Sequence, residues 1–288
     1  MVEVKALACQ LPAELGLPLS RLHVPDIRRA VIERGIVASI GNATVWRWLD
    51  EDAIKPWQHR SWIFPRDPDF EAKAAVVLDL YHRRFDGKCL GPDDYVISAD
   101  EKPSIQARRR CHPTSPPGLA RPMCVEQEYE RCGALQYLAA WDCHHAKIFG
   151  RCEPKTGIAP FGRLVDQVMT VEPYASARRV YWIVDNGSSH RGQRATDRLQ
   201  AAHPNAFLVH TPIHASWLNQ VEIYFSVVQR KVLTPNDFAG LDDVEQRLLD
   251  FQVLYQRIAT PFEWHFTRLD LTKLLHRLDK DASLPLAA

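Results

Sequence analysis

Two short apolar segments, each ending at an aspartate, constrain the fold of this chain more than any other feature. Tyr95–Ala99 leads into Asp100, and Arg179–Val184 leads into Asp185. Short runs of apolar and β-branched residues bounded by turn signals are typical of buried strands. In α/β proteins, ligands bind beyond the carboxyl ends of such strands. We therefore expect both carboxylates at a ligand-binding edge of a sheet.

The segments between and after these two strands predict the rest of a mixed sheet. After the first strand, the expected order is strand, strand, helix, strand, helix, strand, helix. Antiparallel strands followed by β–α–β crossovers are typical of an α/β fold with helices on both faces of one five-stranded sheet. A polar, basic and proline-rich insertion over 103–131 separates the first two strands. The further strands are expected at 134–141, 146–151 and 206–210, and the helices at 161–169, 193–202, 217–233 and 241–257.

The N-terminal region predicts short helices. Over residues 20–34, apolar side chains recur at helical spacing, a proline–aspartate pair begins the segment and Gly35 ends it. A second short helix is expected over 43–49. Two helices around a glycine-containing break are typical of a helix-turn-helix DNA reader, although a helical hairpin that touches no DNA has the same outline. The candidates for DNA contact are Thr44, Arg47 and Trp48.

Composition leaves nucleic-acid binding open. The formal net charge of +1 gives no bulk signal for a polyanionic partner, but basic residues cluster at 108–110, 147–163 and 178–198. Such clusters fit either a phosphate track or ordinary solvated faces. No run of about 18 apolar residues is present, so we expect no membrane span.

The seven cysteines predict reduced thiols rather than a disulfide framework. Their number is odd and none has the C-x-x-C spacing, which fits a protein of the cytosol. A zinc site built from Cys143, His144, His145 and Cys152 is an alternative, although adjacent histidines on a strand point in different directions.

Glu222 is the acid of the expected helix 217–233. Apolar residues at spacings of three and four form one stripe of that helix, and a polar stripe lies apart from it. A polar stripe can be a solvated face. Glu222, however, is the only acid of the segment and stands beside Asn and Ser, which favours a residue that lines a site. The polar stripe comprises Asn219, Glu222, Ser226 and Gln229.

Three carboxylates could hold two hard divalent cations. Mg²⁺ prefers oxygen ligands and combines a few carboxylates with water and substrate oxygens. Two such ions about 4 Å apart can activate an attacking oxygen and stabilise a leaving one at a phosphodiester. Asp185 and Asp100 each also have a simpler interpretation, since Asp-Asn-Gly is a turn sequence and Asp100 could cap a helix or pair with Lys102.

Three segments carry a resemblance to a known family. They are 96–102 (VISADEK), 184–190 (VDNGSSH) and 210–222 (HTPIHASWLNQVE). In combination they resemble bacterial insertion-sequence transposases of the mariner superfamily, in the six-thirty group, and the interval from Asp185 to Glu222 is close to the spacing of that group. The resemblance extends over about Ala6 to Leu278.

The resemblance implies an RNase H-like α/β fold and a transposase that cleaves element ends and joins them to target DNA. It implies Asp100, Asp185 and Glu222 as catalytic residues that bind two Mg²⁺ ions, which Mn²⁺ could replace. Asn219 and His190 match positions of the motifs and are expected nearby as auxiliary groups. Double-stranded DNA, both element ends and target, is the implied partner, bound by a homodimer in the bacterial cytoplasm at the nucleoid.

The expected organisation has four parts and departs from the family pattern in one respect. Members usually carry two helix-turn-helix units before the catalytic domain, and here the first is not found. A DNA-binding protein with an inactive, degenerate core is therefore the alternative function, and a nuclease that cuts without joining is another. The expected parts are a helix-turn-helix or winged-helix-like region with its linker (1–66), a connecting helix (67–93), an RNase H-like catalytic domain (94–278) and a tail (279–288).

Overall fold

The computed structural model describes residues 1–59 and 65–283 and divides the chain into two compact units, Met1–Phe64 and Pro65–Ala288. Each unit has its own hydrophobic core. Within the described ranges, no helix is long and apolar enough to cross a membrane. The expected linker lies partly outside the described ranges. The expected tail (279–288) also does so in part: the last helix, α9 (Arg268–Ser283), extends into the tail, and residues 284–288 lie outside the described ranges.

The first unit packs three short helices around one core, α1 (Val2–Ala8), α2 (Val24–Glu33) and α3 (Asn42–Glu51). The helices expected over about 20–34 and 43–49 are confirmed. The His23 amide donates to the Asp26 carboxylate at 3.1 Å, which satisfies an amide at the start of α2. Gly35, with φ of +68°, takes the left-handed conformation that ends the helix. The carboxyl half of the unit therefore has the expected order of helix, glycine break and helix.

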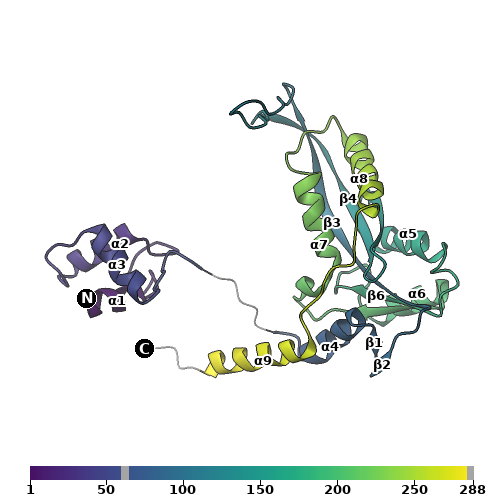
Figure 1. Ribbon diagram of the computed structural model, residues 1–288, viewed down its shortest axis with the longest axis horizontal. Helices are drawn as coiled ribbons and strands as arrows, with labels where there is room; N and C mark the ends of the chain where they lie inside the picture. Colours follow the sequence, from purple (N-terminus) through teal and green to yellow (C-terminus); the bar gives the residue numbers. More distant parts are fainter. Residues whose placement is uncertain (60–64, 284–288) are drawn as a thin grey trace. The chain divides into compact units, whose positions relative to one another are not determined.

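The second unit is built on a five-stranded mixed sheet (Figure 1). Its strand order is β5–β4–β3–β6–β7, in which the first three strands are antiparallel and the last three parallel. All five strands were expected, in this chain order. The strands are β3 (Asp94–Arg110), β4 (Tyr129–Asp142), β5 (Lys147–Glu153), β6 (Arg179–Val184) and β7 (Ala206–His210).

Helices cover both faces of this sheet, because side chains alternate along its strands. On β6, Tyr181 and Ile183 face one core, and Val180, Trp182 and Val184 face the other. The first face is covered by α4 (Phe70–Tyr81), α7 (Val221–Lys231) and α8 (Leu241–Gln256), and the second by α5 (Ile158–Met169) and α6 (Gln193–Ala202).

The expected connecting helix ends earlier than predicted. A connecting helix was expected over 67–93, but α4 stops at Tyr81 and a small hairpin follows. The cause is a turn in which Arg83 and Asp86 have positive φ angles, a conformation that a helix cannot continue through. The hairpin strands are β1 (Arg84–Phe85) and β2 (Lys88–Cys89).

Much of the expected insertion over 103–131 is also strand. The strands β3 and β4 continue to pair as far as Arg110 and Tyr129, with register shifts along the way, and run on past the shorter strands (Figure 1). Asn236 donates to the Gln106 carbonyl at 2.8 Å and accepts from the Arg108 amide at 3.0 Å. A residue far along the chain therefore stabilises the extension, which local sequence patterns could not predict.

Candidate active site

Strand pairing brings the two aspartates to one edge of the sheet. The parallel strands β3 and β6 pair through Ser98 and Ile183 at the end of their common ladder. Two residues further along each strand stand Asp100 and Asp185. The parallel register therefore places Asp100 level with Asp185, at the edge where β6 ends; Asp185 directly follows β6, whereas Asp100 lies inside β3, which continues to Arg110.

Asn219 attaches the segment that carries Glu222 to this edge of the sheet. Its side-chain amide donates to the Ala99 carbonyl at 3.0 Å and to the Asp100 carboxylate at 3.1 Å. Its side-chain oxygen accepts a hydrogen bond from Ser98, whose hydroxyl accepts from the Val221 amide at 2.8 Å. All of these residues, Asp100 included, are buried, so Asn219 fixes where α7 begins relative to β3.

The position of Glu222 in its helix differs from the expected one. A continuous helix over 217–233 was expected, but a 3₁₀ turn, η1 (Ser216–Leu218), comes first and α7 begins only at Val221. Glu222 therefore lies in the first turn of α7, where the partial positive charge of the helix start favours an anion. The break is held by Tyr81, whose hydroxyl donates to the Leu218 carbonyl at 2.6 Å and accepts from the Gln220 amide at 3.2 Å.

The three acids are close enough to perturb one another. Burial raises the pKa of Asp100 to about 7, and repulsion from Asp185, Glu101 and Glu222 adds to the effect. Burial also raises the pKa of Glu222; Lys102 opposes this shift and Asp185 adds to it. Glu101, which directly follows Asp100, also contributes to this repulsion and was not among the expected site residues.

Asp185 behaves differently from the other two acids because His190 compensates its charge. The His190 Nε2 atom lies 2.5 Å from Asp185 Oδ1, and the Gly187 amide donates to the same oxygen at 2.7 Å. The hydrogen bond from His190 lowers the pKa of Asp185 although burial opposes it. A β-carbon at Gly187 would stand 2.9 Å from both Asp185 Oδ1 and His190 Nε2, so only glycine leaves room for this pair.

His190 is itself fully buried and held from several sides. Its Nδ1 atom lies 3.0 Å from the Ser189 hydroxyl, which donates to Glu101 at 3.0 Å. Its carbonyl accepts from His210 Nε2 at 2.6 Å. The loop that follows β6 is thereby attached to the first acidic strand and to β7.

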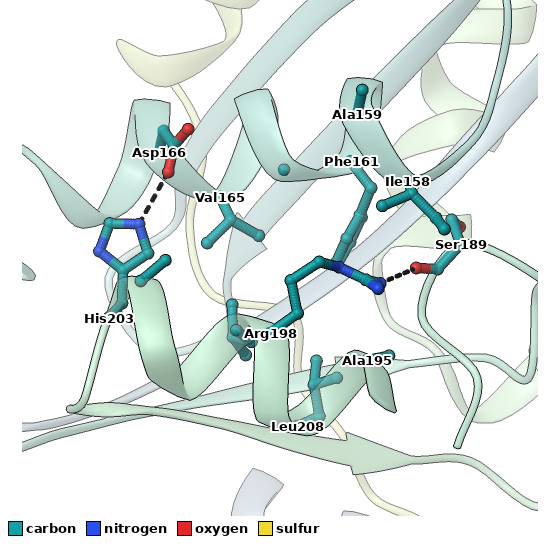
Figure 2. Close-up of a pocket in the computed structure, with 13 residues that line it drawn as sticks. Ile158, Ala159, Phe161, Val165, Asp166, Ser189, Ala195, Arg198, His203 and Leu208 are labelled. Carbon is teal, nitrogen blue, oxygen red and sulfur yellow. Dashed lines mark hydrogen bonds and ion pairs between the residues drawn. The ribbon is translucent and has the colours of Figure 1, made fainter. Parts of the chain in front are cut away.

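A hollow of 250 Å³ lies behind this loop, between α5 and α6 (Figure 2). Its walls are largely apolar and include Phe161, whose ring packs against His190 with centroids 5.0 Å apart. Figure 2 shows the Arg198 side chain reaching along the hollow to the Ser189 carbonyl, to which it donates at 3.0 Å. At the other end His203 lies 2.8 Å from Asp166. The hydrogen bond from Arg198 attaches α6 to the candidate-site loop.

A second hollow, of 340 Å³, opens directly beside Asp185. The loop between β7 and α7 forms one side of it, and the start of the loop after β6 forms the other. Asn186 joins the two loops by donating to the Thr211 carbonyl at 2.7 Å. The lining residues are Asp185, Asn186, Gly187 and the segment 211–216.

The donor atoms at this edge suit a hard divalent cation, although they do not enclose one. Carboxylate oxygens are the ligands that such ions prefer, and a cation would relieve the repulsion that raises the pKa of Asp100. Within residues 1–59 and 65–283, however, no group of three or more His, Cys, Asp or Glu side chains is arranged to hold a metal ion. Asp185 is directed to His190 instead, and mutual repulsion of the acids opposes a tighter cluster.

The DNA-contact candidates all lie on α3 of the first unit. Arg47 is exposed and Thr44 is half-buried. Trp48 packs against the core of the unit, whereas the neighbouring Trp46 is 50% exposed. Since the helix turns about 100° per residue, the two rings point to different sides, and the core takes most of Trp48. Trp48 is half-buried, as Thr44 is.

Comparisons with known proteins identify a family and a fold. The profile of the family described as DDE superfamily endonuclease matches residues 95–245, which contain all three acids. No curated protein matches the sequence.

Among solved structures, the Mos1 mariner paired end complex with Mn is 15% identical, with a TM-score of 0.51 over 91% of this chain and 78% of that chain. The Mos1 strand transfer complex is 14% identical, with a TM-score of 0.51 over 97% of this chain and 76% of that chain. A pre-cleavage Mos1 transpososome is 14% identical, with a TM-score of 0.51 over 90% and 80% of the two chains. At these identities the likeness is one of fold, and it confirms the expected RNase H-like α/β class.

Proposed function

The chain belongs to the DDE superfamily endonucleases, and on this premise we propose that it is a DNA transposase. It would cleave DNA strands at the ends of a mobile element and join them to target DNA. The observation that carries the proposal is geometric: the parallel register of β3 and β6 aligns Asp100 with Asp185, and Asn219, three residues before Glu222, donates to Asp100. Burial is the main cause of the raised pKa of Asp100, and repulsion from Asp185 and Glu222 adds to it. Similarity of fold to the Mos1 strand transfer complex also supports it.

We propose that Asp100, Asp185 and Glu222 bind divalent cations, two Mg²⁺ ions that Mn²⁺ could replace. When bound, such ions supply activation of the attacking oxygen and stabilisation of the leaving oxygen at a phosphodiester. The donor set supports the assignment, since all three side chains offer carboxylate oxygens.

Two auxiliary residues keep these carboxylates in place. Asn219 orients Asp100 through its side-chain amide and fixes the start of α7, which carries Glu222. His190 orients Asp185 through a short hydrogen bond from a buried position. Both act on the carboxylates rather than on DNA and are therefore positioning residues.

We further propose that double-stranded DNA is the partner, bound as element ends and as target. The first unit would act as the helix-turn-helix reader through α3, with Arg47 and Thr44 facing the groove. Because two ends must be cut and joined together, a homodimer on DNA is the simplest assembly. The Mos1 structures of similar fold contain paired transposon ends, which supports this arrangement.

The first prediction concerns Asp185→Asn. This variant should abolish Mg²⁺-dependent cleavage, by at least a hundredfold, because it removes a metal-binding charge, while DNA affinity changes little. The measurement is cleavage and strand transfer of labelled inverted-repeat DNA from the flanks of the coding sequence, with Mg²⁺ against Ca²⁺.

Asp197→Asn is the matched control, because Asp197 is an exposed aspartate of α6 outside the site. Cleavage retained in Asp185→Asn would refute the catalytic assignment. DNA that is cleaved by hydrolysis but never joined to a target would show that the protein is an endonuclease and not a transposase.

A DNA-binding protein with an inactive core is the second candidate function. It is favoured by one observation, that among the described residues no three ligand side chains are arranged around a metal position. Specific binding of the inverted repeats, with no cleavage in Mg²⁺ or Mn²⁺, would establish this function instead.

A further inference from the structure

The loop between β7 and α7 contains a strained turn beside the acidic site. The Ala215 amide donates to the Pro212 carbonyl at 3.1 Å, which closes a four-residue turn. Its third residue, His214, has φ of +61°, whereas Ile213 does not have a positive φ. This is the pattern of a type II turn, in which the third position favours Gly or Asn. A side chain there carries a conformational cost, which contacts on either side of the turn offset.

The strain of this turn is maintained by contacts on both sides. The Ile213 amide donates to Asp67 at 3.0 Å, and the side chain of Asp67 is fully buried and also bonds Lys73 at 2.9 Å. On the other side, the Thr211 amide donates to the Val184 carbonyl at 2.9 Å. The start of the second unit and the strand that leads into Asp185 therefore hold the turn in one conformation.

The position of His214 separates it from the other strained residues. Positive φ angles occur at other non-glycine residues too, but those lie in hairpins, in connections or at a bulge. Among the described residues with such angles, His214 alone lines the 340 Å³ hollow beside Asp185. The others are Ala53, Arg83, Asp86, Ser104, Ala120 and Ala146.

The imidazole of His214 is available to a ligand. The side chain is exposed, and no hydrogen bond or ion pair joins it to another described residue. The hollow contains one acid, Asp185, whose Oδ1 already accepts from His190 and from the Gly187 amide. The hollow is lined by no other acid, so the imidazole of His214 offers a hydrogen-bond donor to an anion there.

We propose that His214 donates a hydrogen bond from its imidazole to a backbone phosphate of the DNA strand that lies in the active site. The inference rests on the proposed function and makes His214 a substrate-contact residue of the same site. The hollow adjoins Asp185, so the phosphate contacted is one that flanks the scissile bond. The strained turn places this donor, and Asp67 keeps the turn in place.

His214→Gly tests the role of the side chain without harming the fold. Glycine adopts a positive φ without strain, so this variant should be as stable as the natural chain or more stable. It should nevertheless bind the DNA at least tenfold more weakly, because a hydrogen bond to a charged group is lost. Asparagine also adopts a positive φ readily, so the DNA affinity of His214→Asn should lie between those of the natural chain and His214→Gly. Ala120→Gly, at an exposed residue with a positive φ, is the control for relief of the same strain away from the site.

The contact itself is tested by a double-mutant cycle with DNA in which single phosphates are replaced by neutral methylphosphonates. The probe is a fluorescent inverted-repeat duplex, and affinity is measured in Ca²⁺. At one position near the cleavage site, the natural chain should lose about tenfold in affinity and His214→Gly should lose nothing further. Equal losses for both chains at every position, or full affinity of His214→Gly, would overturn the inference.

The same measurement separates this inference from the proposed function. If the natural chain binds the duplex but never cleaves it, the proposed transposase function is refuted. The double-mutant cycle can still test the contact of His214 with DNA. A natural chain that binds no DNA overturns both.

Discussion

Asp100 is a carboxylate that the protein buries among other carboxylates, and this placement has a thermodynamic cost. Its pKa of about 7 lies above its ordinary value of 3.8, so the folded chain binds this proton more tightly than the unfolded chain does. The metal-free protein therefore loses stability as pH rises from about 4 to 7, and the full loss is present above 7. The loss is at most about 4 kcal/mol.

Asp100→Asn should consequently stabilise the metal-free protein. At pH 8 in EDTA its free energy of unfolding should rise by a few kcal/mol, at most about 4, because the ionised group is gone. Below pH 4 the two proteins should converge. Urea titrations at both pH values measure the difference, and Asp197→Asn should show none. An Asp100→Asn chain that is less stable at pH 8 would contradict the electrostatic account.

At the residue scale, the sequence predicted the aspartates better than their surroundings. Asp100 and Asp185 each directly follow an apolar run, and a parallel register aligns them, although β3 continues beyond Asp100 to Arg110. Glu222 could be found as the only acid of its segment. Contacts such as that of Tyr81 with Leu218 and Gln220 could not, since they join residues far apart in the chain and leave no periodic signal.

At the element scale, the start of α7 decides where Glu222 stands. Apolar spacing over 217–233 predicted one helix, because η1 and α7 keep their apolar residues on the same side. The break between them depends on the hydroxyl of a residue in α4, outside the window that periodicity samples. The order of the strands along the chain was predictable from apolar runs. The extension of β3 and β4 was not, because Asn236, far away in the sequence, stabilises it.

Tyr81→Phe tests the importance of this break. The variant leaves the Leu218 carbonyl and the Gln220 amide buried without this partner, which should cost about 1–3 kcal/mol of unfolding free energy. Cleavage should fall more than stability explains, since the first turn of α7 loses its anchor. Thermal unfolding and cleavage rates at a temperature where both proteins are folded measure the two effects. Unchanged cleavage would show that Asn219 alone fixes α7.

At the scale of the whole molecule, the two units have separate cores. The core of the first unit lies within residues 4–57, and both cores of the second unit lie after residue 65. Towards the boundary between the units, Ile54 and Trp57 still pack against the core of the first unit.

Leu49→Ala should therefore affect only one of two unfolding transitions. Leu49 is fully buried in the first unit, and its truncation should cost about 2–5 kcal/mol there. Calorimetry should show the corresponding transition moved down and the other unchanged. Leu78→Ala, in the core of the second unit, is the matched variant that should move only the other transition. A single transition that both variants shift equally would contradict the division.

The network around Asn219 also bears on the order in which the ribosome makes this protein. Asp100 is synthesised early, but Asn219, which orients it, and Glu222 come more than a hundred residues later. Translation proceeds from the N-terminus at about 5–20 residues per second, so the nascent chain spends several seconds with its first acid unsupported. A product released before Val221 would keep two aspartates and the first unit, and could occupy DNA without cutting it.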